Sequence, residues 1–535
     1  MTALARFGTL GLEEYQASTA LDLARRVADG SLSPVQLTEC ALHLARAAEP
    51  VVNAYAALLP ERALREAAAL EAQARAGQLR SPLHGVPVAV KDNFYYQGEP
   101  TGKGSLTSSD EPAATSSPMV ARLVDGGAVV IGKTTTPEFG WKGTGSSPRT
   151  GVTRNPWDPA KNPGGSSAGS GATVAAGAVP VATGTDAGGS IRIPASFCGV
   201  VGFKPTLGAI PVWPGTVNET LSHAGPLARS VADVRAVLDL TRGPDPRDPQ
   251  SAFPAVRTDP PGRRLRIGVV PRPFGVPPDP AVAALFERTS MLIRSSAGVE
   301  LTEVDDLGVS LPREIFEAMW VTGRGLGFAD LIRRRGDVMD PGLTRLLPLA
   351  EAYSLADYYR ALEARRAFNA RMFGLLAEWD LLLMPTMPVT AFAADAEVPP
   401  GGEADAPLPW VTWTPYTYPF NITGQPAISL PCGPAADGLP AGLQIVGPWG
   451  HDLRVLDFAL VCEQALAVSK PVTKDRGALC KPPSASRAST RPRTSSATWP
   501  RSTGSATTRS GSPTPRCTRA TAGLTSPWPP APRTG

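Results

Sequence analysis

The stretch GTDAGGSIRIPASFCGVVGFKPT, residues 184–206, is the part of the chain that says most about its fold and chemistry. Its glycines allow a loop in which backbone N–H groups converge, and such a nest of donors suits an oxyanion that develops on a substrate carbonyl. Ser190 stands at the end of this loop, where it can attack that carbonyl. Because a serine hydroxyl is a weak nucleophile at its free pKa, it needs a base from elsewhere in the chain.

A second glycine- and serine-rich stretch, NPGGSSAGSG, occupies residues 162–171 and holds the serine pair 166–167. Between the two stretches, the sequence predicts a helix of small residues over 170–178. A short strand, VPVAT (179–183), and the loop GTDAGGS should follow. Small side chains let neighbouring backbone approach closely, so we expect this region to be internal.

The candidate base is Lys91, in the segment GVPVAVKDN. Val86, Val88 and Val90 recur with a strand period, which places Lys91 on the opposite face at the end of the strand. A lysine can act as a base where burial disfavours its charged form and lowers its pKa. Taken alone, Lys91 would be an ordinary surface lysine, and glycine-flanked serines would be turn formers. The four histidines all lie outside both glycine- and serine-rich motifs: His43, His84, His223 and His451.

Together these three segments resemble the amidase signature family. The family pattern is a lysine in V-K-D-N, then G-G-S-S-G-G-S, then G-T-D-x-G-G-S-I-R-x-P, and this chain has VKDN, GGSSAGS and GTDAGGSIRIP. The visible departure is Ala168, where glycine is commoner. The spacing of 24 residues between Ser166 and Ser190 agrees with the family. Further similar segments, such as NPWDP and NITGQPAISLP, extend the resemblance over roughly residues 10–470.

The resemblance implies a fold and a mechanism. The fold is α/β, with a mixed central β-sheet covered by α-helices on both faces. Ser190 is the acylated nucleophile, Ser166 sits in a cis peptide and passes a proton, and Lys91 is the base. The reaction is hydrolysis of a carboxamide to a carboxylate plus ammonia or amine, and it needs no metal or organic cofactor.

The residues around the nucleophile receive supporting roles. The resemblance implies an oxyanion hole made by the backbone N–H groups of Ala187, Gly188, Gly189 and Ser190. Ser167 is expected to donate a supporting hydrogen bond. Asp186 and Arg192 flank the nucleophile and are expected to orient its loop through charge-assisted bonds rather than to take part in catalysis.

Two other motifs fit the serine pair less well. Residues 165–169 form a formal G-x-S-x-G, but the elbow of α/β-hydrolases requires a strand directly before it. The preceding NPWDPAKNPG is rich in proline and glycine and does not look like a strand. GSSAGSGAT resembles a phosphate loop, but no Gly-Lys-Ser/Thr follows it.

Two alternatives to a stand-alone amidase stay open. The glutamyl-tRNA(Gln) amidotransferase contains one subunit of the same family, which hands ammonia to a partner. In that subunit the segment after the KPT element usually reads YGxVSRYG followed by SSLD, whereas this chain has LGAIPVWPG and then TLSHAGP, which argues against it. The second alternative is a catalytically inactive binding protein of the same fold. The substrate itself is not identified by the sequence.

Charge divides the chain into an amidase domain at 1–470 and a tail at 471–535. Eleven of the 52 basic and one of the 48 acidic residues lie in the tail, so residues 1–470 carry a net charge of −6. The last 55 residues contain no Val, Ile, Phe, Tyr or Met, and we predict that they are disordered. Their bias towards residues of GC-rich codons suggests a shifted reading frame, and the alternative is a genuine basic interaction tail.

Composition gives no reason to expect nucleic-acid binding or membrane insertion. The body is mildly acidic, and no run of about 18 apolar residues appears. The six cysteines lie far apart without a C-x-x-C pair, which favours a reducing compartment, and the N-terminus has no signal-peptide pattern. We therefore expect a cytoplasmic protein that binds a small-molecule amide. A homodimer is expected by resemblance only.

Overall fold

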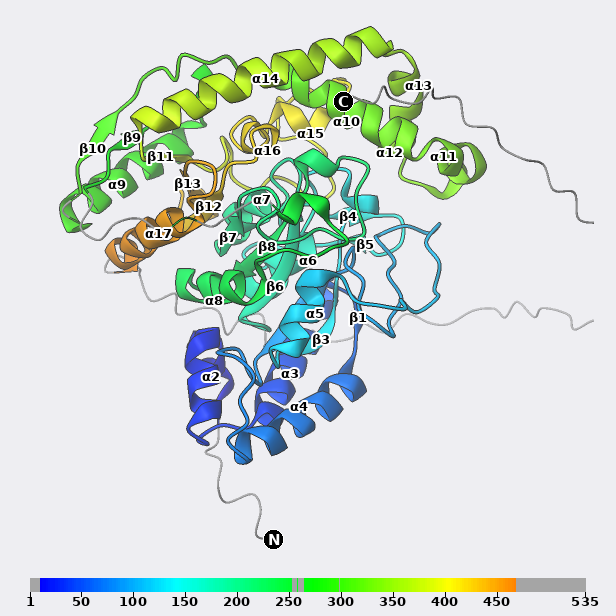
Figure 1. The fold of residues 1–535 in the computed structure, drawn as a ribbon, viewed down its shortest axis with the longest axis vertical. Coiled ribbons are helices and arrows are strands. Elements are labelled where there is room, and N and C mark those ends of the chain that lie inside the picture. Colours follow the sequence, from blue (N-terminus) through cyan, green and yellow to red (C-terminus); the bar gives the residue numbers. More distant parts are fainter. Residues whose placement is uncertain (1–9, 253–256, 258–263, 298, 468–535) are drawn as a thin grey trace, which may run out of the picture. The chain divides into compact units, whose positions relative to one another are not determined.

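A computed structural model describes residues 10–252, 257, 264–297 and 299–467 of the chain. Within them, a mixed sheet of eleven strands is the central element, accompanied by a small two-stranded sheet (Figure 1). The tail at 471–535, with its predicted disorder and its reading-frame hypothesis, lies outside the described residues.

The eleven strands join parallel and antiparallel pairs into one sheet. In spatial order they are β1 (Tyr55–Leu58), β3 (Val129–Thr134), β2 (Pro87–Lys91), β6 (Val181–Asp186), β8 (His223–Ala228), β7 (Val201–Lys204), β12 (Ala427–Pro434), β13 (Pro440–Val446), β11 (Leu381–Pro385), β9 (Ile267–Val269) and β10 (Leu301–Glu303). β2 is parallel to both of its neighbours, and antiparallel pairs run from β6 to β11. The small sheet pairs β4 (Ser146–Ser147) with β5 (Gly151–Val152).

Side chains alternate across the first strands, and helices cover both faces. Val88 and Val130 enter one buried cluster, whereas Ala89 and Val129 enter another. The first cluster is completed by α2 (Ala20–Ala28), α5 (Pro118–Asp125), α8 (Val231–Thr241), α9 (Pro280–Ala297) and α17 (Asp452–Ala467). The second is completed by α1 (Leu12–Ala17), α3 (Pro34–Val52), α4 (Pro60–Arg75), α6 (Ala168–Ala175) and α7 (Arg192–Cys198). The predicted mixed sheet with helices on both faces is confirmed.

A third cluster, rich in aromatic residues, packs on the strands of the second half. Leu382 and Met384 of β11 meet α10 (Arg313–Gly327) and the long α14 (Leu355–Glu378) there. In Figure 1, α14 lies across the end of the view opposite to α3 and α4. Shorter helices complete this part of the fold: α11 (Ala329–Arg335), α12 (Pro341–Thr344), α13 (Leu346–Glu351), α15 (Pro409–Thr412) and α16 (Pro419–Ile422).

The structure corrects the predicted boundary of the first motif. We predicted a loop from residue 184, but β6 continues to Asp186. The reason is a partner strand that the sequence did not reveal, because Gly184 and Asp186 pair with Gly225 and His223 of β8. The loop that carries the nucleophile is therefore short, and it connects β6 to α7.

Candidate active site

Lys91 is the last residue of β2, and its side chain is fully buried. Its Nζ lies within hydrogen-bond distance of Ser166 Oγ at 2.8 Å, of Ser167 Oγ at 3.0 Å and of Thr185 Oγ1 at 2.9 Å. Among the described residues no carboxylate forms an ion pair with it. Burial lowers the pKa of Lys91 well below 10.5, against the opposing pull of the negative charge of Asp186 and with the help of the positive charge of Arg324. The neutral amine that a base requires is thereby favoured.

The serine pair lies where the chain enters α6. The Gly165–Ser166 peptide bond is cis, as the family resemblance implied. Ser167 precedes the first residue of α6, and its Oγ donates to the Thr185 carbonyl at 3.3 Å. Ser167 thus donates a hydrogen bond beside the nucleophile loop, and its supporting role in catalysis stays a prediction. Residues 153–165, which directly precede the serine pair, form no strand. The elbow of α/β-hydrolases requires a strand at this position, so residues 165–169 do not form one.

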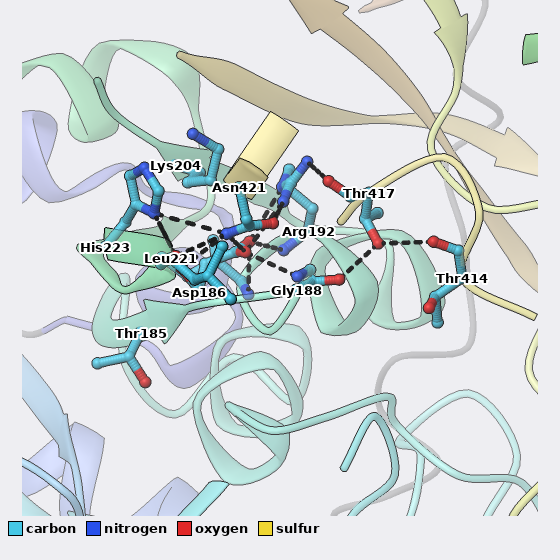
Figure 2. A network of polar contacts seen from close by, with 12 residues as sticks. Thr185, Asp186, Gly188, Arg192, Lys204, Leu221, His223, Thr414, Thr417 and Asn421 are labelled. Carbon is cyan, nitrogen blue, oxygen red and sulfur yellow. Dashed lines mark hydrogen bonds and ion pairs between the residues drawn. The ribbon is translucent and has the colours of Figure 1, made fainter. Parts of the chain in front are cut away.

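Asp186 and Arg192 brace the nucleophile loop from within (Figure 2). Both side chains are fully buried, and Arg192 Nη2 lies 2.9 Å from Asp186 Oδ1. The carboxylate also accepts backbone N–H bonds from Gly189 at 2.7 Å and from Ile191 at 3.1 Å. Burial alone would raise the pKa of Asp186, but the Arg192 guanidinium beside it holds that pKa well below its usual range. These contacts agree with the orienting role expected for the pair.

Residues from the C-terminal half close this network. Thr417 Oγ1 donates to the Gly188 carbonyl at 2.8 Å, and Asn421 Nδ2 donates to the Asp186 carboxylate at 2.9 Å (Figure 2). Gly189 has φ +129°, and a Cβ there would lie 2.4 Å from Thr417 Oγ1, so only glycine fits this position. The loop is therefore held in one conformation by side chains that are more than 220 residues away in the sequence.

The predicted oxyanion donors differ in their bonding. The N–H of Gly189 is committed to Asp186, as described above. Within the described residues, the N–H groups of Ala187, Gly188 and Ser190 make no hydrogen bond to another backbone group or side chain. These three donors remain as the predicted oxyanion hole.

The loop opens onto a cavity of about 180 Å³. Ser190, which is 7% exposed, lines this cavity together with Ser166, Thr185 and Ala187. The structure thus brings all three predicted catalytic residues to one place, since Ser166 lines the cavity with Ser190 and also contacts Lys91 Nζ.

A model of the family described as Amidase matches residues 36–456. The chain belongs to the amidase family. It is 34% identical over 482 residues to one subunit of the glutamyl-tRNA(Gln) amidotransferase of Synechococcus sp. (strain CC9605), an alignment that covers 83% of this chain and 95% of the relative. It is also 34% identical over 456 residues to the acylamidase of Rhodococcus erythropolis, with 82% of this chain and 94% of the relative covered.

Solved structures of similar proteins have the same fold as this chain. The 6-aminohexanoate cyclic dimer hydrolase complexed with its substrate is 31% identical and matches with a TM-score of 0.76, over 86% of this chain and 99% of that chain. The amidase signature and the α/β fold expected from the sequence are therefore confirmed. The relatives include hydrolases as well as part of a transferase, so the amidase family accommodates both kinds of reaction on one fold.

Several residues at this amidase site were not predicted. Thr185 accepts from Lys91 and also from Asn93 Nδ2 at 2.8 Å. Arg324, from α10, and Lys103 line the cavity. Thr185 stands one position before Asp186 in the motif and could have been noticed there, but no sequence pattern connects Arg324 or Lys103 with the serines.

One histidine, His223, lies beside the nucleophile loop, where its ring is held by backbone carbonyls. His223 lies in the network of Figure 2, where its Nδ1 is 2.9 Å from the Leu221 carbonyl and 3.1 Å from the Asp186 carbonyl. Burial lowers the pKa of His223 well below 6.5, and these two acceptors assign the ring proton to Nδ1. Its role is to hold the end of β6.

The described residues contain no group of His, Cys, Asp or Glu side chains arranged to hold a metal ion. Across the same residues, no helix combines the length and apolarity needed to span a bilayer.

Proposed function

We propose that this protein is a stand-alone amide hydrolase, in which Ser190 is the nucleophile, Ser166 the proton relay and Lys91 the base. The observation that carries the proposal is the 2.8 Å contact between Lys91 Nζ and Ser166 Oγ, in a buried place without a carboxylate partner for the lysine among the described residues. Ser166 and Ser190 line one cavity, which is the proximity that a proton relay from nucleophile to base requires.

The contacts of Lys91 suit a neutral amine. A neutral amine has two N–H donors and one lone pair, and three hydroxyl oxygens surround Nζ at 2.8 to 3.0 Å. Two hydroxyls can accept and one must donate to the lone pair. Ser167 already donates to the Thr185 carbonyl, and the shortest contact is with Ser166. We therefore assign the donated proton to Ser166, which is the direction that a relay towards Lys91 requires.

The proposed cycle conserves every proton. Ser190 Oγ attacks the amide carbon, and its proton moves through Ser166 to Lys91 as the oxyanion forms opposite the N–H groups of Ala187, Gly188 and Ser190. The carbon–nitrogen bond then breaks, and the proton returns from Lys91 through Ser166 to the departing nitrogen. Water adds to the acyl-enzyme by the same relay and releases the carboxylic acid with a free Ser190 hydroxyl.

The cavity supports hydrolysis of a simple amide over transfer of ammonia from glutamine. The α-ammonium group of a bound glutamine would lie in a cavity lined by Arg324 and Lys103. Among the described side chains that line this cavity none is Asp or Glu, so that ammonium would have no anionic partner among them. The departures LGAIPVWPG and TLSHAGP from the amidotransferase pattern argue in the same direction.

Ammonia release from a panel of primary amides tests the proposal. The purified chain and its Ser190→Ala variant would be compared on acetamide, propionamide, benzamide, phenylacetamide, indoleacetamide and glutamine. We expect release from at least one simple amide, lost in the variant, and a mass increase of the wild-type chain on Ser190 when the acyl-enzyme is trapped. Release from glutamine alone would favour a role in the amidotransferase, and folded protein inactive on all amides would favour the inactive binding protein.

A further inference from the structure

We propose that Arg324 binds a carboxylate on the substrate, so that the natural substrate is a small amide that carries a negative charge close to the scissile bond. This inference rests on the proposed hydrolase function and adds the class of substrate. It starts from a buried cation in the wall of the catalytic cavity that takes part in none of the proposed proton transfers.

Arg324 lies in α10, is only 6% exposed and lines the same cavity as Ser166 and Ser190. Its Nη1 donates to the Phe139 carbonyl at 2.7 Å, and its guanidinium lies over the ring of Trp320 at 4.7 Å from the centroid. Its Nε has no hydrogen-bond partner, and Nη2 contacts no acceptor within the described residues. Nη2 thus keeps its donors for a ligand, whereas Nε is itself buried within the protein.

A buried cation without an anion is costly, which is why such groups are normally paired. The other buried guanidinium near the site, Arg192, is paired with Asp186. No carboxylate lies within ion-pair distance of Arg324 among the described residues. Burial lowers the pKa of Arg324 to about 10, so the side chain stays cationic at neutral pH. A carboxylate that enters with the substrate would supply the missing partner.

The rest of the cavity favours the same ligand. Lys103 adds a second cation to the wall, and the side chains described as lining the cavity include neither Asp nor Glu. The volume of about 180 Å³ is close to that of a cavity of about 150 Å³ that holds one benzene molecule. A compact anionic amide fits these limits, whereas a long acyl chain or a cationic amide does not.

The planar guanidinium also matches the geometry of a carboxylate better than that of a neutral group. Charge-assisted hydrogen bonds stabilise a complex enough to change its affinity by about tenfold to a hundredfold. Because Arg324 and Ser190 share a small cavity, the bound carboxylate would also orient the amide carbon towards the nucleophile.

Isosteric pairs of amides test the proposal. Succinamate and 4-methylpentanamide differ only in a carboxylate against an isopropyl group on the acyl side. N-acetylglycine and N-isobutylacetamide make the same exchange on the amine side. We expect wild-type kcat/KM to favour the anion by at least about tenfold within one pair, and that pair tells which side of the amide faces Arg324.

The Arg324→Gln variant should lose this preference, measured as the ratio of kcat/KM within the pair, and Arg324→Lys should keep part of it. Arg313→Gln is the matched control. It makes the same exchange in α10, at a residue that pairs with Glu317 at 2.8 Å and does not line the cavity, so it should keep the wild-type ratio. A ratio near one in the wild type, or an unchanged ratio in a folded Arg324→Gln, overturns the proposal and leaves Arg324 a structural role.

A binding measurement separates this inference from the proposed function. Calorimetry on Ser190→Ala with succinamate and with 4-methylpentanamide needs no turnover. Tighter binding of succinamate without hydrolysis of any amide by the wild type would support the carboxylate site and reject the hydrolase. Hydrolysis without a preference for the anion, in binding or in kcat/KM, would reject the carboxylate site and keep the hydrolase.

Discussion

Lys91 Nζ lies 2.8 Å from Ser166 Oγ, and the lysine is fully buried at the end of β2. Hydroxyl groups surround the amine, and no carboxylate in the described part of the chain forms an ion pair with it. Hydroxyls can bond a neutral amine as well as an ammonium group, whereas a carboxylate would stabilise the charged form. This relationship favours the neutral amine that the proposed base requires, at a pH where an exposed lysine is fully protonated.

Lys91→Met should keep most of the side-chain volume and remove the base. We expect kcat to fall by about a hundredfold to ten-thousandfold, the usual contribution of a positioned general base. Steady-state ammonia release would measure it, and circular dichroism and the thermal midpoint would establish that the variant is folded. A folded Lys91→Met enzyme with wild-type kcat would refute the assigned base.

Ser166→Ala and Ser167→Ala form a matched pair, since both hydroxyls bond Lys91 Nζ but only Ser166 lines the cavity. Ser166→Ala should lower kcat by about a hundredfold or more, because the relay is broken. Ser167→Ala removes two supporting hydrogen bonds, one with Lys91 Nζ and one to the Thr185 carbonyl, but leaves the relay in place, so it should cost about tenfold at most. Equal losses in the two variants would contradict the relay assigned to Ser166.

The pH profile should report the neutral form of Lys91. Its pKa lies well below 10.5, so kcat/KM should rise with pH through that lowered pKa and reach half its plateau far below pH 10.5. The charge of Arg324 contributes to the lowering. In Arg324→Gln the pKa of Lys91 should rise, and the rising limb should move to higher pH, while Arg313→Gln leaves it in place. A profile without this limb would contradict a titrating base.

Asp186→Asn should destabilise the fold as well as the loop, because it leaves Arg192 buried without its anion. Breaking a buried pair in this way costs about 3–5 kcal/mol, to be measured by urea unfolding at pH 7. The matched control is Asp239→Asn in a surface pair with Arg235, where the change should stay within about 1 kcal/mol. Similar effects of the two substitutions would show that Asp186 does not hold the loop.

The pKa of Asp186 gives this contribution a direction in pH. The folded-state pKa lies below the ordinary value of 3.8, so the stabilisation is fully present above that value. It is lost as the pH falls below 3.8 towards the folded-state pKa. The stability difference between wild type and Asp186→Asn should therefore shrink as the pH is lowered through this window.

Gly189→Ala should distort the loop, since Gly189 has φ +129° and a Cβ would lie 2.4 Å from Thr417 Oγ1. Gly243→Ala is the control, because Gly243 has φ +108° but no atom within 4 Å of a Cβ. Both variants should carry the backbone strain of about 1–3 kcal/mol, and only Gly189→Ala should also lose activity. Ammonia release per folded molecule would distinguish them.

The candidate catalytic set was predictable because its chemistry is encoded locally. VKDN, GGSSAGS and GTDAGGSIRIP each carry a short motif with fixed spacing, and the strand period of Val86, Val88 and Val90 already placed Lys91 on the opposite face. The structure then brought Lys91 and Ser166 into contact. Local residue order suffices where a strand end and a tight loop set the direction of a side chain.

Other features depended on partners that are distant in the sequence. HAGPLA has little strand propensity, yet it forms β8 because β6 and β7 offer their backbone groups on both sides. Thr417 and Asn421 hold the nucleophile loop from a segment more than 220 residues away. No periodicity or motif in the sequence predicts the pairing of β8 or the contacts of Thr417 and Asn421.

The sequence by itself thus determined the family, the α/β class and the three residues expected to carry the reaction. Only the tertiary structure decided what surrounds them: the bonding of Gly189 to Asp186 and, among the described residues, the absence of a carboxylate paired with Lys91 or with Arg324 in the cavity wall. The physical reason is that motif spacing sets local backbone geometry. Burial and charge pairing, in contrast, arise from which distant segments pack together.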